Sequence, residues 1–137
     1  MSDPLETLLP HRASMLWIDA LTSCTEKTAR ASVTLTAEHF AAANGEVLET
    51  ALVECVAQTV AAATGRRAQT QAAPDRPTVQ GMLVAISHFR IQSPPLLGKL
   101  LEIEVRELKH LGPMLLISGL VQCEGQTIAS GELTLYA

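Results

Sequence analysis

The segment from Ala51 to Ala63 constrains the fold more than any other part of this chain. It is built from small and aliphatic residues, and between Glu49 and Arg66 the only charged side chain is Glu54. A surface helix carries an apolar stripe and a polar face, whereas a helix that is apolar nearly all round is buried. The sequence therefore predicts a long helix that other elements enclose on most sides.

The residues around this segment indicate where the helix begins and ends. We expect it to run from about Glu46 to Thr64, because Gly65 is a frequent C-terminal stop. Arg66 and Arg67 follow at the end where the helix dipole favours cations. The polar, proline-containing stretch that comes next predicts the longest loop of the chain.

Runs of alternating or continuous apolar residues predict two strands before the helix and four after it. The order of these elements favours an α+β fold, in which a mostly antiparallel sheet wraps around one central helix. Such a sheet leaves an open edge that can pair with another chain, which predicts a homodimer with a continuous sheet. Turns are expected at Asn44–Gly45 and, as a two-residue hairpin, at Glu124–Gly125. The predicted strands are Met15–Leu21, Ala29–Leu35, Gly81–Phe89, Leu101–Arg106, Pro113–Cys123 and Gln126–Tyr136.

Length and composition limit the class of protein. The 137 residues favour a single domain over residues 1–137, and a hydrophobic fraction of 47% is ample for its core. The formal net charge of -4 argues against a nucleic-acid partner. Three cysteines without CxxC spacing predict free thiols in a reducing compartment. Since neither a signal peptide nor a membrane-spanning run is visible, we expect a cytoplasmic protein with no membrane contact.

Glu54 is the first candidate for a catalytic residue. A carboxylate among aliphatic side chains is costly unless it has partners, and such a setting is typical of a general acid or base. Gln58 lies one turn later on the same helix face, where it could orient Glu54 or a water. A structural hydrogen bond at a dimer seam is the alternative for Gln58. By its chemistry His11, in the turn Leu9–Arg12, is the partner that best suits Glu54.

Two motifs resemble those of a known family. The run Leu9–Leu16, LPHRASML, with Ile18–Asp19 after it, is similar to the opening of the hotdog-fold 3-hydroxyacyl-[acyl carrier protein] dehydratases. The run Val53–Gln58, VECVAQ, resembles the E-x-x-A-Q pattern of their central helix. Residues 89–99 and 128–136 resemble their later strands, so the resemblance spans most of the chain. The sequence looks closest to a divergent branch, the dehydratase-like proteins of aryl-polyene gene clusters.

This resemblance implies a hotdog fold and the dehydration of a 3-hydroxyacyl thioester to the trans-2-enoyl thioester in fatty-acid or polyene biosynthesis. The reaction removes an α-proton and protonates the leaving hydroxyl, which is work for one acid and one base. In the family a His of one subunit and a Glu of the other supply them, and the resemblance assigns the Glu to Glu54. Backbone N–H groups at the helix N-terminus meet the thioester carbonyl. No cofactor is implied, and the substrate is linked to acyl carrier protein or coenzyme A.

One feature of the family is absent from this chain. The well-studied members carry a Gly-His-Phe-Pro-Gly turn with a catalytic His before the helix, whereas residues 38–46 here read EHFAAANGE. His11 is then a candidate base, with a structural role in the N-terminal turn as the alternative. His39 is a weaker candidate that we place in substrate binding. His88 and His110 are expected to be solvated or core residues. A hetero-oligomer with another hotdog subunit that supplies the His is a further alternative.

Basic residues would steer an acidic carrier protein even toward an acidic chain. We expect Arg66, Arg67, Arg76 and Arg90 near the mouth of the pocket, with Arg90 binding substrate. The alternative is that these arginines belong to an ordinary solvated surface. Asp19 is expected to be structural. Two other functions stay open: a hotdog thioesterase whose helix carboxylate activates water or attacks the carbonyl, and a non-catalytic acyl-binding or partner subunit.

Overall fold

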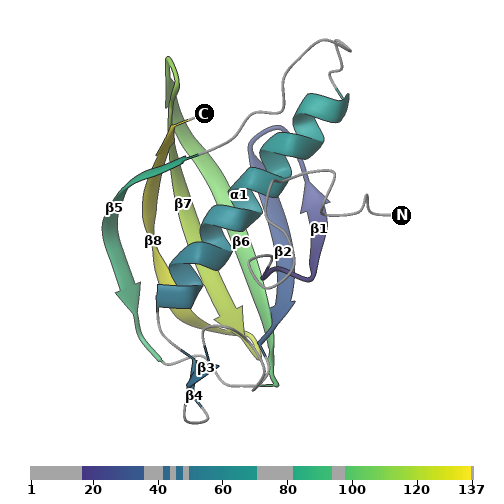
Figure 1. The fold of residues 1–137 in the computed structure, drawn as a ribbon, viewed down its shortest axis with the longest axis vertical. Coiled ribbons are helices and arrows are strands. Elements are labelled where there is room, and N and C mark those ends of the chain that lie inside the picture. The colour runs from purple at the N-terminus through teal and green to yellow at the C-terminus, as the bar shows by residue number, and fades with distance from the viewer. Residues whose placement is uncertain are drawn as a thin grey trace.

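The computed structural model describes residues 17–35, 42–43, 46–47, 50–70, 82–93 and 98–136 of the chain. In this part, one long helix, α1 (Thr50–Thr70), lies across one face of a six-stranded sheet (Figure 1). The strand order is β1-β2-β6-β7-β8-β5, and every neighbouring pair is antiparallel. The strands are β1 (Ala20–Cys24), β2 (Thr28–Thr34), β5 (Met82–Ile91), β6 (Leu100–Leu111), β7 (Met114–Cys123) and β8 (Gln126–Tyr136). Two short strands, β3 (Ala42–Ala43) and β4 (Glu46–Val47), pair with each other before the helix.

The α+β architecture predicted from the order of the elements is confirmed. Four of the six predicted strands agree with β2, β5, β7 and β8 to within a few residues, whereas β6 runs well beyond its predicted end. The hairpin at Glu124–Gly125 is also confirmed, because both residues have positive φ angles, 53° and 80°, as its two central positions require. Asn44–Gly45 lies outside the described residues, although β3 and β4 pair on either side of it.

The first strand begins later than predicted. The sequence pattern suggested a strand from Met15 to Leu21, but β1 starts at Ala20. The reason lies in the backbone N–H groups of Trp17 and Ile18, which donate to Oε1 of Gln58 at 2.8 and 3.4 Å. This segment is therefore held by the helix rather than by the sheet.

The helix is displaced toward its C-terminal side, because β4 takes the residues where the helix was predicted to start and Gly65 does not end it. A glycine inside a helix costs about 1 kcal/mol relative to alanine. Arg67 offsets that cost: its Nε donates to the carbonyl of Thr25 at 2.8 Å and its guanidinium also reaches the carbonyl of Thr28 at 3.3 Å. The last turns of α1 are thereby tied to the β1–β2 turn.

The core lies between α1 and the inner face of the sheet. Most residues of α1 between Ala51 and Ala63 are buried, as the sequence predicted, and the helix contacts β1, β2, β6 and β7. A close approach to β7 depends on Gly119, since a Cβ added there would lie 2.5 Å from Cγ1 of Val56. The helix therefore sits closely on the sheet at the middle of β7.

The two faces of the sheet differ in character. Along β7 buried and half-buried residues alternate strictly, so one set of side chains faces α1 and the other faces outward. Strands β1 and β5 are the edges of the sheet, and no described strand pairs with the outer side of either. No helix in the described ranges has both the length and the apolar character that crossing a membrane requires.

Candidate active site

The centre of the candidate site is the amide of Gln58, which is fully buried. Its Oε1 accepts the N–H groups of Trp17 and Ile18, and its Nε2 donates to Oε1 of Glu54 at 3.2 Å. Because only the carbonyl oxygen of an amide can accept these two N–H groups, the amino group of Gln58 must point to Glu54. The predicted pairing of Gln58 with Glu54 one turn earlier is thus present in the structure.

Glu54 itself is half-buried, which differs from the enclosed carboxylate that the sequence suggested. The sheet lies against the opposite side of α1, and Glu54 borders a half-buried stripe formed by Val53, Ala57 and Ala61. The carboxylate therefore stands at the boundary between the core and the open surface. A group in that position is held by the protein and can still be reached by a substrate.

Cys55, next to Glu54 in sequence, points into the core and is fully buried. Burial, with the negative charges of Glu54 and Asp19 acting in the same direction, raises the pKa of its thiol to about 12. The thiol is therefore protonated at neutral pH and unsuited to nucleophilic chemistry. Cys55 is therefore a core residue, and all three cysteines are free, as the sequence predicted.

Asp19 has the structural role that the sequence predicted. Its Oδ2 accepts the backbone N–H of Thr34 at 2.7 Å, and its own N–H donates to the carbonyl of Ser32 at 2.8 Å. These bonds join the segment before β1 to the end of β2. They also place a negative charge on the side of the helix where Cys55 lies, as the pKa of that thiol shows.

The described histidines do not lie at Glu54. His88 is exposed on β5, beside a register shift, with φ at 54°. His110 is exposed near the end of β6, 3.8 Å from Glu107. Both agree with the expectation of solvated histidines, whereas His11 and His39 fall outside the described residues. Which imidazole serves Glu54 therefore stays a prediction.

Arg90 and Glu54 also lie apart within one chain, because they are on opposite sides of the sheet. Arg90 pairs in register with Ser130, whose side chain points away from α1, so the arginine lies on the outer face of the sheet. A contact between Arg90 and a substrate at Glu54 would have to come about across subunits. Arg76, predicted near the same pocket, is outside the described residues.

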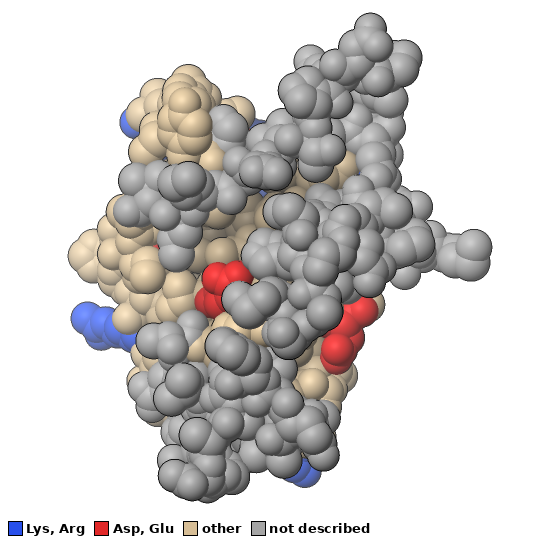
Figure 2. Space-filling model, in the orientation of Figure 1, with Lys and Arg blue, Asp and Glu red and all other residues tan. Residues whose placement is uncertain are grey.

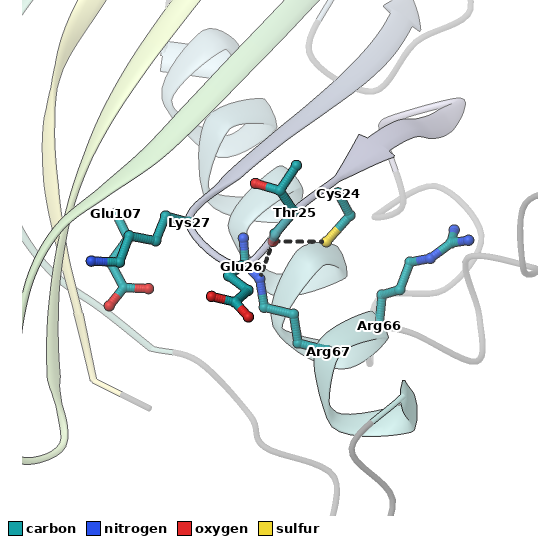
Figure 3. Close-up of a pocket in the computed structure, with 7 residues that line it drawn as sticks. All are labelled: Cys24, Thr25, Glu26, Lys27, Arg66, Arg67 and Glu107. Atoms are coloured by element: carbon teal, nitrogen blue, oxygen red, sulfur yellow. Dashed lines mark hydrogen bonds between the residues drawn. The ribbon is translucent and has the colours of Figure 1, made fainter.

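The other two predicted arginines, Arg66 and Arg67, lie at the far end of α1. They border a cavity of about 630 Å³ between the helix end and the β1–β2 turn, where Figure 3 shows Arg67 directed to Thr25 and Arg66 turned away. At a rise of about 1.5 Å per residue, Arg66 is roughly 18 Å along the helix from Glu54. This cavity is therefore separate from the candidate active site.

Figure 2 shows the side of the molecule on which α1 lies. Among the residues coloured there, acidic side chains appear at two separate places, and Lys and Arg appear mainly near the outline. The described part of this face therefore carries no concentrated basic patch that would attract an acidic partner directly onto the helix.

The fold defines the class of protein, because the solved structures that resemble this chain have the hotdog fold. One chain of "The Dehydratase Heterocomplex ApeI:P from Xenorhabdus doucetiae" is 21% identical, with a TM-score of 0.89 over 99% of this chain and 91% of that chain. An HP0420 homologue from Helicobacter felis is 13% identical, with a TM-score of 0.73 over 100% and 92% of the two chains. The PaaI protein of the E. coli phenylacetic acid degradation operon is 14% identical, with a TM-score of 0.68 over 88% and 82%.

A family model narrows this class. The ApeP-like model, described as ApeP dehydratase, matches residues 3–137, so the chain belongs to that family. It is therefore a dehydratase, a lyase that removes water from an acyl thioester, as the sequence motifs implied. A search of curated proteins finds no match.

Sequence reasoning missed one part of the site, the backbone of Trp17 and Ile18. Their N–H groups orient the Gln58 amide and thereby the group that it offers to Glu54. Every non-proline residue carries the same N–H donor, so no side-chain pattern could have marked these two. The one usable signal was that a Gln in an otherwise apolar helix needs several partners.

Proposed function

We propose that Glu54 is the residue that protonates the departing hydroxyl of a 3-hydroxyacyl thioester. The observation that carries this role is the hydrogen bond from the buried Gln58 amide to Oε1 of the half-buried Glu54 carboxyl. The amide is held by two further hydrogen bonds, so the carboxyl is presented in one orientation. Such positioning before the reaction is what a general acid requires.

The proton balance of the reaction assigns one step to this carboxyl. A base takes the proton from the carbon next to the thioester carbonyl, and a C=C bond forms as the C–O bond of the hydroxyl breaks. The protonated carboxyl of Glu54 gives its proton to the leaving oxygen, which departs as water. The proton held by the base then returns to the carboxylate before the next turnover. Gln58 keeps the carboxyl in place throughout and takes no proton.

We assign the base to an imidazole, with His11 as the first candidate and His39 as the second. The alternative source is an adjoining hotdog subunit, since neither described histidine is near Glu54. Alanine variants of His11 and His39 distinguish these sources. Loss of turnover in one variant identifies the base within this chain. Unchanged turnover in both variants moves the base to a partner.

The direct test of Glu54 is the Glu54→Gln variant, assayed by the change in enoyl absorbance with a 3-hydroxyacyl thioester. Loss of a general acid lowers turnover by roughly 10²- to 10⁴-fold. Glu124→Gln, at the exposed β7–β8 hairpin, is the matched control and should retain full turnover. Turnover of Glu54→Gln at the level of the parent would exclude the proposed role. Release of free thiol without an absorbance change would instead point to a thioesterase.

The substrate carrier is proposed to be an acyl carrier protein. Carrier proteins are acidic, and Arg66, which borders the cavity at the C-terminal end of α1, is a cation that an acidic partner can contact there. A comparison of kcat/KM for the same acyl group on carrier protein and on coenzyme A tests this choice. Equal values would show that the carrier contributes nothing to recognition.

We further propose that the chain works as an oligomer joined through the β5 edge. β5 is an edge strand, and Ile86 on its inner face is 51% exposed, which is unusual for an isoleucine that faces a core. The structurally similar ApeI:P assembly is a heterocomplex of dehydratases, so a second hotdog subunit is a candidate partner beside a second copy of this chain. Replacing Ile86 by Lys should dissociate the oligomer in gel filtration. An unchanged elution volume would place the interface elsewhere.

A further inference from the structure

The face of the sheet that points away from α1 has a hollow at its centre, with a volume of about 530 Å³. Its floor is formed by Ser118 and Gly119 of β7 and by Ser130 and Gly131 of β8. These residues are neighbours across the two strands, because Gly119 pairs in register with Gly131. The hollow exists because small side chains meet here on adjacent central strands. Figure 1 shows that α1 lies on the opposite face.

The outward side chains of β6, which borders the hollow, are divided by charge. Glu102 and Glu104 lie toward one end of the strand, and Arg106 and Lys109 lie toward the other. Glu102, Glu104 and Arg106 point outward, since Leu101, Ile103 and Val105 between them are buried against the helix side. Lys109 also points outward, because the register shift between Glu107 and Lys109 pairs it with Leu116 of the outward set on β7. One half of this strand is thus acidic and the other half is basic. Such a pattern complements a copy of itself turned end for end.

We propose that a second copy of this chain stacks on this face, outer sheet against outer sheet, about a two-fold axis perpendicular to the strands. An axis that passes between Glu104 and Arg106 lays each β6 antiparallel over the other β6. Arg106 then faces Glu104 of the second copy, and Lys109 faces Glu102 of the second copy. A two-fold interface uses the same patch on both subunits, so each attractive pair occurs twice.

Rotation about the same axis also places a side chain of the second copy in the hollow. On β7, Ser118 pairs in register with Arg106 of β6 and with Glu132 of β8. Leu120, two residues later on β7, pairs with Glu104 of β6 and with Ser130 of β8. The rotation that exchanges the two β6 positions therefore places Leu120 of one copy over Ser118 of the other. Leu120 is a half-buried apolar side chain that borders the hollow, and the small residues opposite leave room for it. Leu120 and Ser118, which lies at the floor of the hollow, are thus two residues apart on β7.

The available area suits a stable contact between copies. Four strands about 4.8 Å apart, each contributing about ten residues at 3.3 Å, present roughly 600 Å² per copy, or about 1,200 Å² in total. Specific interfaces begin near 1,000 Å². Stacking uses the face of the sheet and leaves its edges free. It therefore goes beyond the oligomer proposed through β5, and both contacts can exist in one particle.

The test is the number of chains per particle, measured by light scattering after gel filtration. We expect Lys109→Glu to halve that number relative to the parent protein, because it places two acidic side chains opposite each other in both copies of the contact. Glu102→Lys should do the same. The double variant, Lys109→Glu with Glu102→Lys, should restore the parental number. Within one chain these two residues are six register positions, roughly 20 Å, apart along β6, so they can compensate each other only between chains.

Two further variants complete the design. Ser118→Trp fills the hollow and should also halve the number of chains, whereas Lys27→Glu makes the same charge change as Lys109→Glu at the β1–β2 turn and should leave it unchanged. Failure of the double variant to restore the assembly would overturn the proposal, as would a parental particle that no variant on this face alters. Enoyl formation is measured on every variant, and the outcome for Glu54 does not depend on the number of chains.

Discussion

Two side chains of α1, Gln58 near its middle and Arg67 in its last turns, bind backbone groups on either side of β1, but they do so in different ways. In the first half, the neutral and fully buried amide of Gln58 binds the N–H groups of residues 17–18. In the last turns, the half-buried cation Arg67 binds the carbonyls of Thr25 and Thr28. The Gln58 amide also binds Glu54, whereas Arg67 joins the last turns of α1 to the β1–β2 turn.

This difference predicts that the protein tolerates loss of the Arg67 hydrogen bonds better than loss of the Gln58 hydrogen bonds. Water can replace a hydrogen bond at a half-exposed guanidinium, and the net loss is then small. Water cannot readily reach the buried amide, so its partners would be left unsatisfied, and an unsatisfied buried group costs about 1–3 kcal/mol. Function and stability should therefore both be sensitive at Gln58 and only stability at Arg67.

The largest effect is expected for Gln58→Leu. The variant removes the acceptor for two backbone N–H groups and the donor to Glu54, so the free energy of unfolding should fall by at least about 2 kcal/mol. Turnover of the folded fraction should fall as well, because Glu54 loses its orientation. Urea unfolding and the enoyl assay measure the two quantities. A Gln58→Leu protein as stable and as active as the parent would contradict the role assigned to the Gln58 amide.

Gly119→Ala tests the packing of α1 on the sheet at Val56, two residues before Gln58. The added Cβ would lie 2.5 Å from Cγ1 of Val56, a distance that real contacts do not show. Overpacking of this kind costs about 1–3 kcal/mol, read from the urea midpoint. The double variant Gly119→Ala with Val56→Ala should regain part of the loss if the contact is the cause. Equal losses in the single and double variants would point to a different origin.

The pH dependence of stability reports on the same buried side of the helix. Burial raises the pKa of the Cys55 thiol from 9.0 to about 12, with the charges of Glu54 and Asp19 acting in the same direction. A raised folded-state pKa gives stability that is fully present below pH 9 and is lost as the pH rises toward 12. Relative to Cys55→Ala, the parent should lose up to about 1.4 kcal/mol per pH unit in this window. Parallel stability curves for the two proteins above pH 9 would be the contrary result.

Arg67→Met should have the smallest effect. It keeps much of the aliphatic stem and removes the hydrogen bonds to Thr25 and Thr28, so the free energy of unfolding should fall by about 0.5–1.5 kcal/mol. The kcat of the folded enzyme should not change, because this end of α1 is remote from Glu54. A fall in kcat as large as that of Gln58→Leu would remove the distinction between the roles of Gln58 and Arg67.

The sequence was sufficient to predict the central helix, most strands of the large sheet and the central pair of the candidate site, but not the short strands β3 and β4. The apolar run around Glu54 has helical spacing and too little polarity for a surface helix, so both the helix and its burial followed from it. Gln58 was found because residues four apart share a helix face. The E-x-x-A-Q resemblance pointed to the same pair independently.

Other features depend on contacts that spacing does not encode. The helix continues past Gly65 because Arg67 is anchored by the β1–β2 turn, which is distant in sequence. β1 starts late because its first N–H groups are taken by Gln58. Arg90 lies on the outer face because of the register shift in β5 between Ser87 and Arg90, and a one-residue shift moves a side chain to the other face.

The most direct test of the central claim is a double-mutant cycle between Glu54 and Gln58, with turnover measured on folded protein by enoyl absorbance. If Gln58 acts by holding Glu54, Gln58→Leu lowers turnover in the parent but lowers it no further when Glu54→Gln is already present. Losses that multiply, so that each substitution has the same effect with or without the other, would contradict the claim that Glu54 held by Gln58 is the catalytic carboxyl of this chain.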